Sequence, residues 1–347
     1  MGSVKNCGLL PFLQLVGVCV VAFLASTGET LEASATTRVE QDSAPPPKTA
    51  PQLKDQKNPE SAGQQPEVKL IEAGQAPHRA LRLRPTVGYQ QRHELEMSMS
   101  MESDTNGQAA PRVNIPTVKY TLDSTVTEVT PEGDISFTVE YSDASVVDND
   151  EIQLELLTPM EEMATSMIGL KVKSTVDYRG FAKGVQMEIP DGMPATAAQQ
   201  MEQLSKSLEQ LTSPFPVEPV GVGGKWKVVV PMNSGGIQLL QTMEYTVLEM
   251  ANDVVTLTVD ISQQAEEQEL ELPEAGLPTR LTSLECQGTG RLKLNLSSVL
   301  ADESSVKADV TVVIVVEAGQ EFEVTQDVTT EAKLKAVPRP SADTDKR

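Results

Sequence analysis

A row of methionines comes closest, in residue type and spacing, to a binding site in this sequence. Met97, Met99 and Met101 alternate with serine and glutamate, so on a β-strand their side chains would share one face. Thioether sulfur binds soft metals such as copper(I), but only His93 stands near enough in the sequence to assist it. A buried strand face requires the same alternation. We therefore expect an apolar surface here and no metal site.

Residues suited to catalysis are scarce. The chain contains 2 histidines, His78 and His93, and 3 cysteines. A serine–histidine–aspartate triad would have to use His93, because His78 falls within a proline-rich stretch. No GxSxG, HExxH, CxxC or Walker motif occurs, and no spacing among the 50 acidic residues singles out a catalytic pair. We expect a protein that is not an enzyme and has neither catalytic residues nor a cofactor.

The first residues follow the pattern of a secretory signal. Lys5 provides the positive charge, residues 9–25 are almost entirely apolar, and small residues follow. We expect residues 1–27 to be a signal segment and the protein to be exported, either periplasmic or extracellular in the cell envelope. An N-terminal anchor that is not cleaved is the alternative. Cys19 lacks the small preceding residue of a lipidated cysteine, which disfavours a lipid anchor.

Residues 28–79 differ in composition from the rest of the chain. Proline is frequent and large apolar residues are sparse, and such a segment cannot bury enough surface to offset its ordering entropy. We expect a disordered tether. Cys286 is then the only cysteine of the mature chain, so we expect no internal disulfide and a small buried apolar role for its side chain.

Charge restricts the partners. The formal net charge is −22 and there is no basic stripe. Such a surface repels nucleic acid and anionic lipid. We therefore expect no nucleic-acid partner, and contact with a membrane only through an uncleaved or lipidated N-terminus.

Residues 125–142 recur in similar form at residues 246–262, and both stretches have the pattern of a β-hairpin. In each, apolar residues alternate with polar ones on either side of turn residues, which are 131–134 in the first and Asn252 and Asp253 in the second. This similarity predicts an internal duplication.

Two helices are expected. Residues 194–211 place Met201, Leu204 and Leu208 on one face, between the two halves of the chain. A shorter helix should begin at a capping box at Thr158 and end at Gly169. Four of its side chains are expected to point inward: Met160, Met163, Met167 and Ile168.

We expect a mainly β fold, a β-rich α+β domain over residues 80–336, followed by a polar tail at residues 337–347. Two duplicated antiparallel meander halves, about residues 80–190 and 218–336, would form a curved sheet, half-barrel or sandwich. One or two helices would pack on it.

Short motifs in the second half carry a resemblance. They are PVGVGGKW at residues 219–226, Tyr-Thr-Val at residues 245–247, and Gly-Thr-Gly at residues 288–290. In these the chain resembles a family of exported bacterial proteins of unknown function, found as secreted proteins or lipoproteins. The resemblance, over about residues 81–334, implies an exported location and brings no catalytic residues.

Three functions are compatible with these patterns. The first is a non-catalytic envelope domain that binds an apolar ligand, in the manner of curved half-barrels that carry lipids or lipoproteins. The alternatives are a tethered structural or interaction module that contacts another envelope protein, and an unrecognised envelope hydrolase. A large cavity would favour the first and a filled core the second. The apolar ligand would contact Met97, Met99, Met101, Met201, Leu204 and Leu208.

Overall fold

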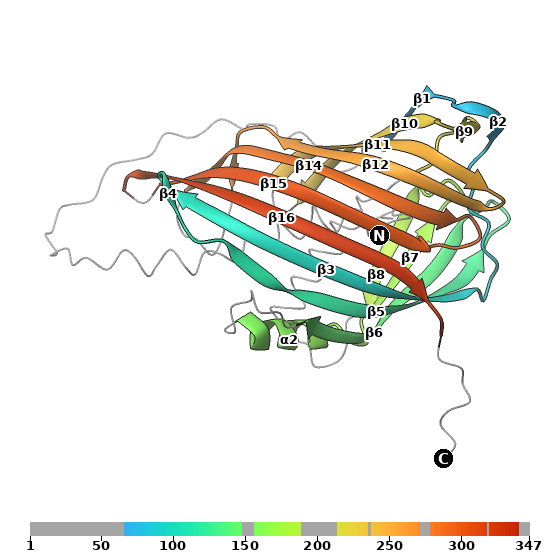
Figure 1. The fold of residues 1–347 in the computed structure, drawn as a ribbon, viewed down its shortest axis with the longest axis horizontal. Coiled ribbons are helices and arrows are strands. Elements are labelled where there is room, and N and C mark those ends of the chain that lie inside the picture. Colours follow the sequence, from blue (N-terminus) through green and yellow to red (C-terminus); the bar gives the residue numbers. More distant parts are fainter. Residues whose placement is uncertain are drawn as a thin grey trace, which may run out of the picture.

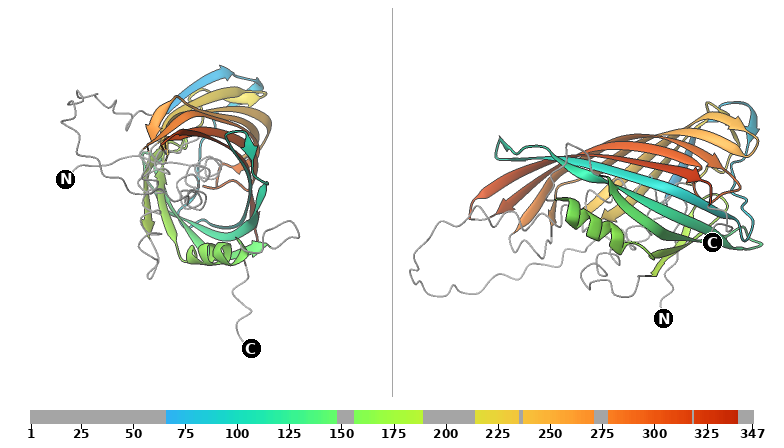
Figure 2. Two further views of the ribbon diagram at one scale, coloured as in Figure 1. Left: turned by 90° about the vertical axis from the view of Figure 1, so that its left-hand side faces the viewer. Right: turned by 60° about the horizontal axis from the view of Figure 1, so that its bottom comes forward.

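The architecture is mainly β, as the sequence predicted. In the described part of the chain, antiparallel strands form one 14-stranded sheet that is not closed, and two short strands form a second sheet. Figure 1 shows the long strands side by side, and Figure 2 shows that the large sheet curls around an axis. The computed structural model describes residues 66–147, 156–188, 214–234, 237–270, 278–317 and 319–339.

The order of strands across the sheet brings the two halves of the chain together at β16 and β3. Starting from one edge, neighbouring strands follow in the order β1 (Glu67–Glu72), β10 (Lys225–Ser234), β11 (Ile237–Ala251), β12 (Val254–Ala265), β14 (Thr279–Asn295) and β15 (Glu303–Glu317). It continues through β16 (Glu321–Val337), β3 (Gln90–Thr105), β5 (Val113–Val129), β6 (Ile135–Val147), β7 (Lys171–Val176) and β8 (Ala182–Glu188). The short strands are β2 (Gln75–Arg79) paired with β9 (Val220–Val222), β4 (Gln108–Ala109) beside β3, and β13 (Gln268–Leu270) beside β14.

Alternation of side chains divides the sheet into two unlike faces. In β11, Leu239, Met243 and Tyr245 are buried, whereas Gln238 and Glu244, at alternate positions, are exposed. The same period of two runs through β12 and β14 to β16. Because a curled sheet shields its inner side, the apolar side chains form the inner face, here called the concave face, and polar side chains cover the outer face.

One end of the curl, here called the covered end, is closed by chain segments outside the sheet. Leu81 and Phe215 are fully buried there. The backbone N–H of Arg84 donates to the Leu296 carbonyl at 2.6 Å, and that of Leu83 donates to the Tyr178 carbonyl at 2.8 Å. Through these bonds, residues 81–84 contact the residue that follows β14 and the β7–β8 turn.

Two arginines hold the segment that precedes β9 at the covered end. Arg179, in the β7–β8 turn, donates from Nε and Nη2 to the Phe215 carbonyl at 3.0 and 2.8 Å. Arg82 donates to the carbonyls of Pro216 and Val217 at 2.9 and 2.7 Å. The segment that leads into β9 and β10 is thereby fixed to the β7–β8 turn.

The predicted tether needs correction. Strands β1 and β2 occupy residues 67–79, within the stretch expected to be disordered. In β1, Val68 pairs with Val228 and Leu70 with Trp226, so this stretch of the chain extends the edge of the sheet. Residues 1–65 and the predicted helix at residues 194–211 lie outside the described residues, as does most of the predicted tail.

The shorter predicted helix exists as α2 (Leu157–Ser166), and Gly169 follows it with a φ of 88°. Its cap differs from the prediction, because Leu156 is the N-cap and no side chain bonds to the first turn. Met160 and Met167 pack on the core as expected. Met163 and Ile168 are 50% and 38% exposed, contrary to the prediction, because the inward side of the helix is narrow and centres on buried Ala164.

Both predicted hairpins are present, as β5–β6 and β11–β12, and they share a detail. The pairing slips between Val126 and Glu128 in the first and between Val247 and Glu249 in the second. The N–H of Val126 donates to the Tyr89 carbonyl, and the N–H of Val247 donates to the Gly224 carbonyl, both at 2.9 Å. The bulges therefore occupy matching positions, whereas the duplication itself stays a prediction.

Candidate functional site

The antiparallel register arranges the side chains of the concave face in rows across the strands. The row here called the glutamine row contains Gln241, Gln263, Cys286, Val310, Val328, Met101 and Val113. The next row contains Met243, Ile261, Gly288, Ala308, Thr330, Met99 and Ile115. The third contains Tyr245, Val259, Gly290, Val306, Ala332, Met97 and Val118.

Each of the three predicted methionines belongs to one of these rows. Met97, Met99 and Met101, here called the methionine patch, lie on β3 and pack against the core, and each remains only half-buried. Their neighbours Val113 and Ile115 on β5 are also half-buried. At the covered end of the same strand, by contrast, Leu95 is fully buried. The end of the curl that holds the methionine patch is therefore less tightly covered.

Small residues occupy the centre of the concave face. A Cβ placed on Gly290 would lie 3.0 Å from side-chain carbons of Val259 and Val306. One placed on Gly288 would lie 3.0 Å from the Ala308 Cβ. Larger residues would collide with these neighbours. The concave face therefore carries no bulky side chain at these two positions between the methionine patch and β12.

Helix α2 borders the methionine end beside β6 (Figure 1). The N–H of Tyr141 donates to the Leu170 carbonyl at 3.0 Å, so the chain after α2 pairs with β6 where β7 begins. Tyr141 packs edge-on against Tyr120, with ring centroids 5.4 Å apart. A shallow depression of about 450 Å³ lies beside α2. It is lined by Glu161, Glu162, Thr165 and Ser166.

A pair of glutamines interrupts the apolar concave face. Gln241 and Gln263 face each other on β11 and β12 and are only 1% and 4% exposed. Gln263 Nε2 donates to Gln241 Oε1 at 2.5 Å, and Gln241 Nε2 donates to the Met243 sulfur at 3.5 Å. The sequence analysis missed this pair. The signal was visible, because on each of two neighbouring strands a glutamine occupies a position where the alternation predicts an apolar residue.

Charged side chains do not occupy the buried positions that the structure describes. Among the described residues, no lysine, arginine, aspartate or glutamate is buried, and the buried titratable side chains are Tyr120, Tyr245, His93 and Cys286. His93 is fully buried beside the backbone of Ala301, and burial lowers its pKa to about 4. Burial also raises the pKa of Cys286 to about 12. Both groups are therefore neutral at ordinary pH, and the thiol is not a ready nucleophile.

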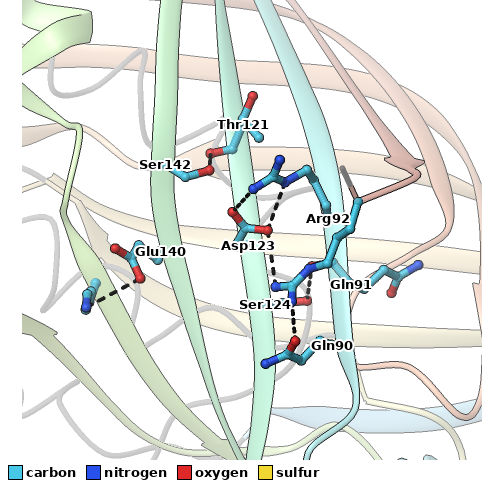
Figure 3. A network of polar contacts seen from close by, with 10 residues as sticks. Gln90, Gln91, Arg92, Thr121, Asp123, Ser124, Glu140 and Ser142 are labelled. Atoms are coloured by element: carbon cyan, nitrogen blue, oxygen red, sulfur yellow. Dashed lines mark hydrogen bonds and ion pairs between the residues drawn. The ribbon is translucent and has the colours of Figure 1, made fainter. Parts of the chain in front are cut away.

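The densest polar network lies on the outer face (Figure 3). Arg92 on β3 binds both carboxylate oxygens of Asp123 on β5, and Arg339 reaches the same carboxylate at 3.2 Å. The hydrogen bonds from Arg92 lower the pKa of Asp123. A carboxylate held by two guanidinium groups is a weak base, so this network joins strands and does not resemble a catalytic centre.

The predicted site residues divide into two groups. The structure places Met97, Met99 and Met101 together on the concave face, as the alternation predicted. Met201, Leu204 and Leu208 lie outside the described residues. Within the described ranges, no group of three or more histidine, cysteine, aspartate or glutamate residues is arranged to hold a metal. No helix in that part of the chain is long and apolar enough to cross a membrane.

Comparison with known proteins gives a partial family match. Residues 196–300, less than one third of the chain, match DUF6263, a family of unknown function. No curated protein matches the sequence.

Solved structures offer only a remote likeness. The chain is similar to Pseudomonas aeruginosa OccK11 (OpdR) with 6% identity and a TM-score of 0.21, over 73% of this chain and 99% of that one. It is similar to Salmonella typhi OmpF, solved in complex with daunomycin, with 7% identity and a TM-score of 0.19, over 71% and 98% of the two chains. A BenF-like porin from Pseudomonas fluorescens Pf-5 gives 7% identity and a TM-score of 0.20, over 72% and 100%. Scores this low carry no argument about function.

Proposed function

We propose that the protein is an exported, non-catalytic binding protein whose concave face holds an apolar ligand such as an acyl chain or lipid. The observation that carries this proposal is the unequal burial along one strand. Leu95 is fully buried, whereas Met97, Met99 and Met101 on the same face of β3 are half-buried. An apolar face left partly open at one end offers surface that a ligand can cover.

Methionine suits such a surface for a physical reason. Its unbranched, polarisable side chain adapts to varied apolar shapes, whereas a core with a single packing uses it sparingly. Covering apolar surface releases about 25 cal/mol for each Å² removed from water. Met160 of α2 and Met167, which caps its C-terminus, are also half-buried against the core, which adds adaptable surface at this end.

The two ends of the curl support a direction of entry. At the covered end, hydrogen bonds from Arg82 and Arg179 hold the segments that seal the sheet. The methionine end carries the half-buried residues and the helix α2. A ligand would therefore enter past the methionine patch and lie on the concave face beside it.

Three further observations support an exported, non-catalytic role. The N-terminal sequence has the pattern of a secretory signal, and the formal net charge is −22. The outer face carries water-exposed ion pairs such as Lys119 with Glu96 at 3.0 Å. Finally, the two buried groups with catalytic potential, His93 and Cys286, are neutral and surrounded by core.

A matched pair of substitutions tests the proposal. Met99→Gln keeps the size of the side chain but adds an amide to the concave face, and Ser98→Gln adds the same group to the opposite face of the strand. We expect Met99→Gln to weaken binding of a dansyl-labelled acyl chain by about tenfold, since an unpaired buried amide costs about 1–3 kcal/mol. Ser98→Gln should bind like the native protein.

Fluorescence titration gives the affinities, and thermal unfolding shows that both variants fold. Native protein that binds no acyl chain would overturn the proposal. A tethered interaction module would then be the remaining function.

A further inference from the structure

We propose that Gln241 and Gln263 bind the polar group of the ligand, and that this group is a neutral acyl ester or acyl amide. The inference rests on the proposed function and specifies the chemistry of its ligand. It starts from the hydrogen-bonding capacity that the two buried amides leave unused.

Two glutamine side chains offer four N–H donors and two carbonyl oxygens. One N–H of Gln263 donates to Gln241 Oε1, and one N–H of Gln241 donates to the weakly accepting sulfur of Met243. Within the described residues, the second N–H of each amide and the Gln263 carbonyl oxygen have no protein partner.

The surroundings make this unused capacity costly. The pair lies between Val230 on β10 and Cys286 on β14, with Met243 and Ile261 in the next row. All four of these neighbours are buried. A buried amide N–H without a partner is costly because its lost bond to water is uncompensated, and each of these amide nitrogens has one N–H beyond the bond that it makes. A ligand group that both accepts and donates hydrogen bonds would satisfy them.

The position of the pair matches the length of an acyl chain. Gln263 and Met101 belong to the same glutamine row, four strands apart. At about 4.8 Å between neighbouring strands, the arc between them is about 19 Å. The residues between them, Cys286, Val310 and Val328, are buried and apolar. A polar group at the glutamines would place the hydrocarbon tail along this row, toward the methionine patch.

Because no charged side chain is buried among the described residues, the polar group of the ligand should be neutral. A carboxylate, phosphate or ammonium group beside Gln241 would have no lysine, arginine, aspartate or glutamate partner among the buried residues that the structure describes. An unpaired charge in an apolar interior is strongly disfavoured. An ester carbonyl accepts from the free amide N–H groups, and a hydroxyl or amide N–H donates to Gln263 Oε1. The neutral ester or amide is therefore preferred over the ionised fatty acid.

The test compares three probes on the full chain: a pyrene-labelled hydrocarbon, monooleoylglycerol, and oleate at a pH where it is ionised. We expect monooleoylglycerol to displace the hydrocarbon at a concentration at least about tenfold lower than oleate does. In Gln241→Leu/Gln263→Leu, this preference should disappear while the hydrocarbon binds as well as before or better. Gln238→Leu, on the exposed side of β11, is the matched control and should keep the preference.

A spectroscopic measurement separates hydrogen bonding from packing. The infrared carbonyl band of an isotope-labelled monooleoylglycerol should shift to lower frequency on binding to the native protein and should not shift in the double leucine variant. Replacing two underused amides by leucine removes unpaired groups, so the variant is expected to fold, and thermal unfolding checks this.

Hydrocarbon binding with equal affinities for monooleoylglycerol and oleate, unchanged by the leucines, would overturn this inference and leave the proposed function intact. Failure of all three probes to bind would overturn both.

Discussion

Arg92 and Asp123 form a two-pronged ion pair across β3 and β5, with Arg92 Nε 2.9 Å from Asp123 Oδ1 and Nη2 2.6 Å from Oδ2. The paired geometry is seen in Figure 3. The pair is partly shielded from water, since the Asp123 side chain is only 16% exposed. Charge-assisted bonds in such a setting contribute more than freely exposed ion pairs do.

We therefore expect Asp123→Asn to lower the free energy of unfolding at pH 7 by about 1–2 kcal/mol. Because the pairing lowers the pKa of Asp123, its stabilisation is present above the unfolded-state pKa and is lost as the pH falls through the folded-state value. In urea unfolding, the difference between the native protein and the variant should be smaller at pH 3 than at pH 7. Asp260→Asn, at an exposed position on β12, should have no such effect. A constant difference between native protein and Asp123→Asn at both pH values would contradict this account.

His93 should make the protein sensitive to acid. Burial lowers its pKa from 6.5 to about 4, so the folded state resists protonation that the unfolded state accepts. Stability is complete above pH 6.5 and is lost as the pH falls toward 4, by about 3 kcal/mol in total. His93→Leu should flatten the dependence of the urea midpoint on pH over this interval. His78→Gln, at an exposed site, should leave it unchanged.

Truncation tests the corrected boundary of the folded region. A chain that starts at Pro66 retains β1 and β2, whereas one that starts at Ala80 loses both. The shorter chain also loses the ion pair between Arg79 and Asp253. We expect its melting temperature to be lower by about 5 °C or more, as expected for a few kcal/mol in a chain of this size. Equal melting temperatures would show that residues 66–79 add nothing to the fold.

Gly221 provides a steric test of the small second sheet. A Cβ at this position would lie 1.7 Å from the Gln75 carbonyl oxygen, so β9 and β2 cannot stay paired if the residue has a side chain. We expect Gly221→Ala to destabilise the protein by about 2 kcal/mol or more. Gly184→Ala on β8 is the matched control, because its Cβ would meet open space. Chemical denaturation of the two variants measures the difference.

The period of two in the sequence was enough to predict several features. It placed Met97, Met99 and Met101 on one face of a strand, and turn residues located both hairpins. Predictions failed where the alternating pattern was too short, or where a strand forms only because a partner strand is available. Val68, Leu70 and Ile71 are too few apolar residues to show a period of two, and they form a strand because the edge of β10 is free to pair with them.

The sequence by itself determined the mainly β composition, the hairpins and the separation of an apolar face from a polar one. These follow from the alternation of side chains along an extended chain, which involves near neighbours alone. Tertiary structure decided that Gln241 opposes Gln263, that both share a row with Met101, and that Met163 points outward. Those outcomes depend on strand order, on register set by bulges, and on which side of α2 meets β6. Each is a contact between residues distant in the chain, and no local pattern specifies it.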